Sequence, residues 1–97
     1  MVDDEVVAAY ARDGAVVVRG LWEGWVDILR AGVEANMASP GQPMPTLKSG
    51  EAGRFFDDYC NWTRIPEFEQ VIHQSDVAEV AAQLMQSPYV QLFHDHV

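Results

Sequence analysis

The chain has 97 residues, of which 48% are hydrophobic, and its 15 acidic side chains outnumber the six basic ones, giving a formal net charge of -9. This length permits one domain at most, and three Trp, three Tyr and four Phe argue against a disordered chain. The few basic residues are scattered rather than clustered, which argues against nucleic acid as a partner.

The cysteine content and the N-terminal sequence indicate the cellular compartment. Cys60 is the only cysteine, so no disulfide can form within the chain, which fits a reducing cytoplasm. Residues 1–5 are acidic where a signal peptide would be basic. No apolar run approaches the roughly 20 residues that a membrane-spanning helix needs. We therefore expect a cytoplasmic protein without membrane association.

The first 38 residues predict a helix, a strand and a longer helix. Residues 3–13 place apolar side chains at helical spacing, with Asp3 or Asp4 as the N-cap and Gly14 as the stop. Residues 15–20 contain three consecutive valines, which favour a strand covered on both faces. A second helix is predicted from about Glu23 to Ala38, where Gly24 and Gly32 require support from tertiary packing. Its expected buried stripe comprises Trp22, Trp25, Ile28, Leu29, Val33 and Met37.

The remaining elements are shorter. Residues 39–53 are rich in Pro and Gly and predict a long loop of functional or mobile character, and residues 54–62 predict an irregular strand or extended segment. Pro66 opens a short helix whose inward side chains are Phe68, Val71 and Ile72. Ser75 or Asp76 caps a helix over residues 77–86, with Val77, Val80, Ala81 and Leu84 buried. The chain ends in a predicted strand, Tyr89–Val97.

That last strand carries the densest cluster of reactive side chains. Because side chains alternate along a strand, His94 and His96 share one face and Asp95 lies on the other. Two imidazoles at this spacing can ligate zinc or iron, or can be hydrogen-bonded pocket or surface residues. His-Asp is adjacent here, so it is not the His-x-Asp pattern of a two-histidine, one-carboxylate iron site. His73, near a helix end, is expected to interact with the helix dipole.

A second group lies in the aromatic stretch before Pro66. Asp57 and Asp58 offer paired carboxylates for acid/base work or cation binding, but neighbouring aspartates are more commonly solvated or cap a helix. Tyr59 and Trp62 are expected in the core or in a pocket wall. Cys60 has no cationic neighbour in the sequence, so we expect a buried, inert thiol.

Three stretches resemble the N-terminal portion of phytanoyl-CoA dioxygenase-like proteins, a family of iron(II)- and 2-oxoglutarate-dependent oxygenases. They are residues 10–21 (YARDGAVVVRGL), the segment from Phe55-Phe56 through Trp62 to Phe68, and residues 87–97 (SPYVQLFHDHV). Together they cover nearly the whole chain, and their order and spacing are more specific than any one of them.

The resemblance implies an α+β fold in which residues 1–97 form the N-terminal portion of a single oxygenase domain. The chain would supply the helical part and the first strands of a double-stranded β-helix, which is incomplete here. The cofactors implied are Fe(II) and 2-oxoglutarate. The family's iron ligands and its basic 2-oxoglutarate anchor would lie beyond Val97, so no catalytic or metal-binding residue is assigned. The position matching His96 contributes to the cosubstrate pocket in this family, and Tyr59 is a weaker candidate for the same pocket.

These implications predict that the complete enzyme hydroxylates a small organic substrate and that the isolated chain is inactive. The alternative is a small, non-catalytic α+β binding module. A third hypothesis is a metal-binding piece that uses His94 and His96.

Overall fold

The computed structural model describes residues 1–42 and 55–97, so Arg54 and most of the predicted loop over residues 39–53 lie outside the described residues. The four predicted helices are confirmed at their expected places. None of the helices in the described ranges is long and apolar enough to cross a bilayer. The elements are α1 (Asp4–Asp13), a 3-10 helix η1 (Glu23–Trp25), α2 (Val26–Ala38), α3 (Pro66–Gln74) and α4 (Val77–Met85).

The predicted strands are wrong, and with them the α+β fold and the start of a double-stranded β-helix. Across residues 1–42 and 55–97 there is no strand and no sheet, only one isolated antiparallel bridge between Tyr59 and His96. Residues 15–20 are not covered on both faces, because the Val17 side chain is 78% exposed. β-Branched residues make a segment compatible with a strand, but a sheet forms only when neighbouring segments pair with it.

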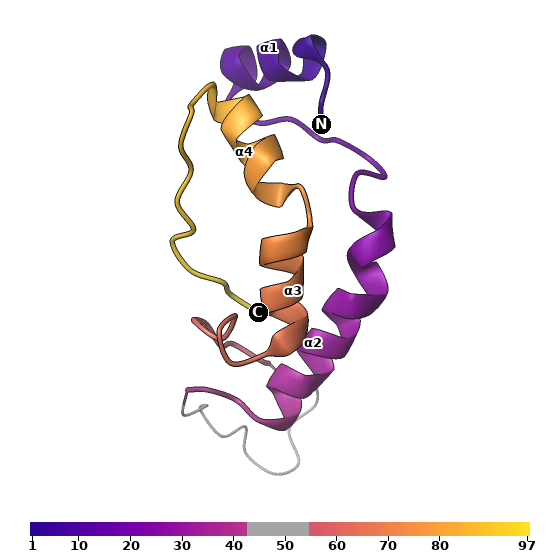
Figure 1. Ribbon diagram of the computed structural model, residues 1–97, viewed down its shortest axis with the longest axis vertical. Helices are drawn as coiled ribbons and strands as arrows, with labels where there is room; N and C mark the ends of the chain where they lie inside the picture. The colour runs from indigo at the N-terminus through magenta and orange to yellow at the C-terminus, as the bar shows by residue number, and fades with distance from the viewer. Residues whose placement is uncertain (43–54) are drawn as a thin grey trace.

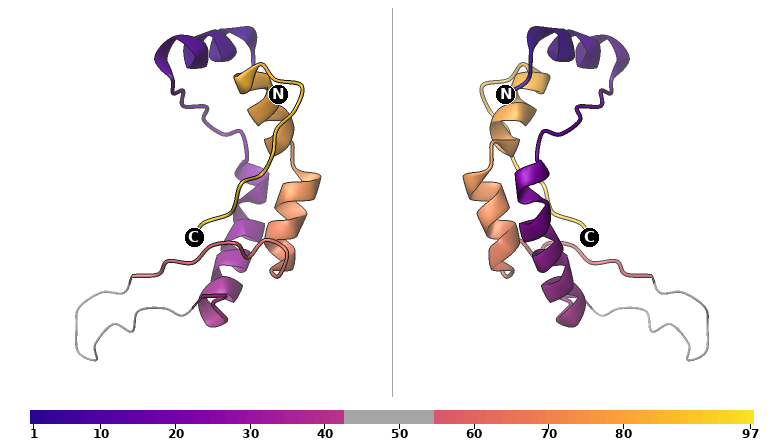
Figure 2. Two further views of the ribbon diagram at one scale, coloured as in Figure 1. Left: turned by 90° about the vertical axis from the view of Figure 1, so that its left-hand side faces the viewer. Right: turned by 90° about the vertical axis from the view of Figure 1, so that its right-hand side faces the viewer.

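The helices form an elongated arrangement rather than a layered sheet protein. Figures 1 and 2 show α2 beside α3, with α4 continuing from α3 after a short turn and α1 lying across the far end of α4. After α4 the chain runs back as an extended segment, residues 87–97, which ends near the start of α3. This return brings the end of the chain against residues 58–62.

The contact between α2 and α3 depends on a glycine. The ring of Phe68 is 6% exposed, and a Cβ added to Gly32 would lie only 2.5 Å from its Cε1 atom. Such a distance is well inside van der Waals contact, so any larger residue at position 32 would push the two helices apart. The weakening of α2 by Gly32 is therefore offset by the close approach of Phe68 that it permits.

The predicted buried stripe of α2 is only partly correct. The fully buried residues of this helix are Gly32 and Asn36, one turn apart on the face toward α3. Three members of the predicted stripe are more than a third exposed, namely Trp22 at 38%, Leu29 at 37% and Met37 at 46%. A small residue and an amide mark the true interface, and neither contributes to an apolar periodicity.

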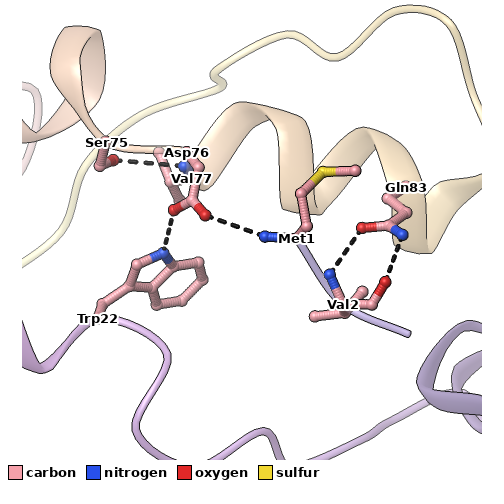
Figure 3. Close-up of polar contacts among 7 residues, drawn as sticks. All are labelled: Met1, Val2, Trp22, Ser75, Asp76, Val77 and Gln83. Carbon is pink, nitrogen blue, oxygen red and sulfur yellow. Dashed lines mark hydrogen bonds and ion pairs between the residues drawn. The ribbon is translucent and has the colours of Figure 1, made fainter.

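The N-terminus is held against α4 by polar contacts (Figure 3). The Gln83 side-chain oxygen accepts a hydrogen bond from the Val2 N–H at 2.9 Å, and its amide nitrogen donates to the Val2 carbonyl. The Asp76 carboxylate accepts from the Met1 ammonium at 3.1 Å and from the Trp22 indole N–H at 2.8 Å. With Val2 only 7% exposed, these contacts fix how α1 crosses α4.

The helix ends follow the sequence signals in part, because Asp3 is the N-cap residue of α1 but makes no side-chain cap hydrogen bond. Gly14 ends α1 in the left-handed conformation, at φ +76°, and its N–H donates to the Tyr10 carbonyl at 2.8 Å. At the start of α4 the Ser75 hydroxyl accepts from the Val77 N–H, while the carboxylate of Asp76 is occupied elsewhere. Of the two predicted caps for this helix, Asp76 is the N-cap residue but makes no side-chain cap hydrogen bond, and Ser75, one residue earlier, supplies the side-chain acceptor.

Candidate functional site

The structure brings together Tyr59 and His96, which are 37 positions apart in the sequence. They face one another across an antiparallel bridge. The backbones of Asp58 and Val97 exchange two hydrogen bonds, at 3.0 and 2.8 Å, and the Cys60 N–H donates to the Asp95 carbonyl at 3.1 Å. This short pairing is the scaffold of the candidate site.

Three rings gather on one side of this pairing. His94 and His96 share a face, as predicted, and their ring centroids are 6.1 Å apart. The Tyr59 ring meets both imidazoles edge-on, with centroids 6.4 Å from His94 and 6.1 Å from His96. Nε2 of His96 also contacts a carboxylate oxygen of Asp57. Because Tyr59 is 46% exposed, this ring cluster is accessible to a ligand.

A buried carboxylate fixes the segment that carries Tyr59. Asp58 has no exposed surface, and one of its oxygens accepts hydrogen bonds from the Asn36 amide at 2.8 Å and the Gly41 N–H at 2.7 Å. Its other oxygen accepts from the Tyr59 N–H at 3.0 Å. One side chain thus joins the C-terminal end of α2 to the bridge.

These contacts also determine the ionisation of Asp58. Burial on its own raises the pKa of the carboxyl group, because the charged form loses its hydration. The hydrogen bonds from Gly41, Asn36 and Tyr59 act in the opposite direction and prevail, so the pKa lies below its ordinary value. Asp58 is therefore anionic at neutral pH although no cationic side chain among the described residues contacts it.

A second carboxylate fixes the opposite segment. Oδ2 of Asp95 accepts hydrogen bonds from the N–H groups of Asn61 and Trp62, each at 2.9 Å. Asn61 is 2% exposed, and its side-chain oxygen accepts from the Arg64 guanidinium at 2.7 Å. Asp95 therefore ties the end of the chain to the turn that precedes α3.

Several expectations for this region are corrected. Asp58 is neither solvated nor a helix cap, because it is buried and holds together two distant segments. Cys60 is exposed rather than buried, and its backbone is left-handed, at φ +62°. Trp62 is half-buried and meets the ring of His73 edge-on at 5.6 Å. His73 lies in the last turn of α3, as predicted.

Sequence reasoning missed the polar residues that support the site, above all Asn36, Asn61 and the supporting role of Asp95. The available signal was positional: Asn36 lies four residues after Gly32, on the same helix face. A buried amide on an interface face usually has a specific partner. Its partner, Asp58, could not be chosen among 15 acidic residues without the fold.

The described side chains fit the two cofactors implied by the resemblance, iron and 2-oxoglutarate, to different degrees. No group of three His, Cys, Asp or Glu side chains able to hold a metal occurs within residues 1–42 and 55–97. The described residues therefore do not by themselves form an iron site. The phenol of Tyr59 and the imidazole of His94 can donate hydrogen bonds, which is the chemistry that a dicarboxylate such as 2-oxoglutarate requires. At His96 the ring nitrogen left for a ligand is Nδ1, because Nε2 contacts Asp57.

Comparison of the chain with protein-family models, with curated proteins and with solved structures finds no match.

Proposed function

We propose that this chain is the helical N-terminal part of an iron(II)- and 2-oxoglutarate-dependent oxygenase of the phytanoyl-CoA dioxygenase-like type, acting on a small organic substrate. In this proposal Tyr59 and His96 belong to one wall of the 2-oxoglutarate pocket. Iron, when bound by the complete enzyme, would supply the oxidising chemistry. The residues of this chain bind and orient, and they do not hold the metal.

The observation that carries the proposal is the juxtaposition of Tyr59 and His96 across the bridge. The resemblance to the oxygenase family implies one pocket for both residues. Two exposed rings, held side by side by the buried carboxylate of Asp58 and the half-buried carboxylate of Asp95, form a preorganised surface. Such a surface supports binding of an anionic ligand at low entropic cost.

The first test is the reading frame of the natural gene. The proposal expects a His-x-Asp pattern soon after codon 97, followed by a later His and a basic residue. A frame that stops at Val97, or that continues without this pattern, would contradict the oxygenase function.

The second test uses the enzyme encoded by that complete frame. Tyr59→Phe and His96→Ala should each raise the KM for 2-oxoglutarate by about tenfold, the loss of one good charge-assisted hydrogen bond. His73→Ala is the matched control, because His73 contacts Trp62 outside the ring cluster. The 97-residue chain alone should not convert 2-oxoglutarate. Equal KM values for the wild type and both site variants would exclude these residues from the pocket.

A second candidate, a small helical binding module without catalysis, is favoured by the surface of α2. Val26, Leu29 and Val33 line a shallow apolar groove flanked by Arg30 and Glu34. Exposed apolar stripes of this kind are typical of surfaces that bind another protein. This candidate predicts a cooperative melt of the 97-residue chain together with no 2-oxoglutarate turnover by the protein from the complete frame. Turnover by that protein would reject it.

A further inference from the structure

The extended segment Tyr89–Phe93 has a free backbone edge. From Val90 to Phe93, no backbone group takes part in a hydrogen bond with the described residues. Its side chains are also poorly covered, since Tyr89 is 83% exposed and Phe93 is 91% exposed. An uncharged, aromatic edge of this kind is a template for pairing with another strand.

The pairing with residues 58–60 shows which edge is free. Asp95 and Val97 direct their backbone groups toward that segment, where they bond to Cys60 and Asp58. Because backbone directions alternate along an extended segment, the even-numbered residues direct theirs to the opposite edge. Val90 and Leu92 thus present N–H and C=O groups on the side away from residues 58–60.

The sequence of this segment is complementary to itself. In an antiparallel pairing centred on Gln91, Tyr89 faces Phe93 of a second copy and Val90 faces Leu92. Aromatic pairs and aliphatic pairs opposite one another are the cross-strand combinations that stabilise antiparallel strands. Gln91 would lie on the two-fold axis, opposite itself, and a symmetric dimer requires such a self-complementary patch.

The neighbouring residues confine the pairing to this register. Pro88 has no N–H and ends the pairable segment on one side. On the other side, Asp95 is held by Asn61 and Trp62. The Ser87 hydroxyl already bonds the backbone of Tyr89, so Val90 and Leu92 are the residues that exchange hydrogen bonds with the second copy. Tyr89, Gln91 and Phe93 then occupy the non-hydrogen-bonded pairs, in which side chains approach most closely.

We propose that Tyr89–Phe93 is a self-association site, at which two copies of this chain pair as antiparallel strands about a two-fold axis at Gln91. The occupant is a second copy because the segment matches itself and contains no charge, in a chain whose net charge of -9 repels another copy elsewhere. The proposal is independent of the oxygenase function, since it uses neither Tyr59 nor His96.

Sedimentation velocity of the 97-residue chain from about 1 μM to about 1 mM tests the pairing, because a small interface binds in this range. We expect a monomer–dimer equilibrium that strengthens with added salt, which screens the net charge. Gln91→Lys and Gln91→Glu each place like charges opposite one another and should weaken the dimer at least about fivefold. An equimolar mixture of the two variants should restore it, since Lys then faces Glu.

Gln74→Lys, the same charge change at the exposed end of α3, is the matched control and should leave dimerisation unchanged. Helical circular dichroism of each variant verifies that the fold is kept. A wild-type chain that stays monomeric to about 1 mM would overturn the proposal. Three other outcomes would also overturn it. They are a dimer that Gln91→Lys leaves unchanged, a Gln74→Lys effect as large as that of Gln91→Lys, and a mixture of the Gln91 variants that fails to restore the dimer.

Discussion

The α2–α3 interface and the junction between residues 58–62 and 95–97 are held together in different ways. At the first, an aromatic ring packs on a glycine, and Phe68 and Gly32 are both buried. At the second, two carboxylates accept backbone and amide hydrogen bonds, and the rings of the candidate site remain exposed. The chain therefore uses apolar packing to assemble its helices and polar contacts to position its site.

This difference shows why few apolar side chains suffice for the fold. Only Val2, Ile65, Phe68 and Val80 are buried hydrophobic residues within the described ranges. Beside them, Asn36, Asp58 and Asn61 are buried polar residues, and the hydrogen bond between Asn36 and Asp58 joins α2 to the segment that carries Tyr59. We expect these hydrogen bonds to hold the junction in one defined geometry, and we expect removal of a single acceptor to destabilise it.

Breaking the apolar region should have the largest effect. Phe68→Ala is expected to lower the free energy of unfolding by about 3 kcal/mol, because it removes a buried ring and leaves a cavity over Gly32. Urea denaturation followed by circular dichroism measures the loss. Phe55→Ala is the matched control, since Phe55 is 74% exposed, and it should change stability by less than about 0.5 kcal/mol. Equal effects of the two substitutions would contradict the assigned core.

Removing the Asp58 carboxylate from the polar junction should lower the free energy of unfolding by somewhat less than Phe68→Ala does. Asp58→Ala leaves the Asn36 amide and the Gly41 N–H without their acceptor, and we expect a loss of about 2 kcal/mol at neutral pH. The matched control is Asp27→Ala, because the Asp27 carboxylate is 97% exposed. A loss no larger than that of the control would show that the junction contributes little to stability.

The same carboxylate predicts a pH dependence. The pKa of Asp58 is lower in the folded chain than its ordinary value of 3.8, so its contribution is complete above that value and is lost as the pH falls through the folded pKa. The difference in unfolding free energy between the wild type and Asp58→Ala should therefore shrink on acidification below 3.8. If this difference in unfolding free energy grew on acidification, the pKa of Asp58 would be raised by folding rather than lowered.

The smallest effect is expected at Asp95. Asp95→Asn keeps the shape but removes the charge that accepts from Asn61 and Trp62, which should cost about 1 kcal/mol. Amide hydrogen exchange at these two positions should accelerate about fivefold, and the end of the chain should detach more readily. Asp57→Asn serves as the control, because among the described residues Asp57 contacts the His96 side chain and no backbone N–H. Unchanged exchange at both amides would remove Asp95 from the junction.

The candidate site was predictable in part. Strand-like alternation placed His94 and His96 on one face, and the structure confirms this because an extended segment keeps the alternation even without a sheet. The assignment of Tyr59 and His96 to one pocket stays a prediction, although the two residues do lie together. Asn61 and the supporting role of Asp95 were not predictable, since hydrogen bonds to the backbone leave no pattern of side-chain spacing.

The sequence by itself determined the four helices, because helical periodicity and end signals such as Gly14 and Pro66 act within a few residues. It did not determine the predicted strands, because valines and aromatic residues favour an extended backbone without specifying a partner for it. Only the tertiary structure decided that these segments form no sheet in the described ranges, and that Tyr59 meets His96. Pairing is a relation between distant segments, and it depends on the buried acceptor of Asp58 that local sequence does not reveal.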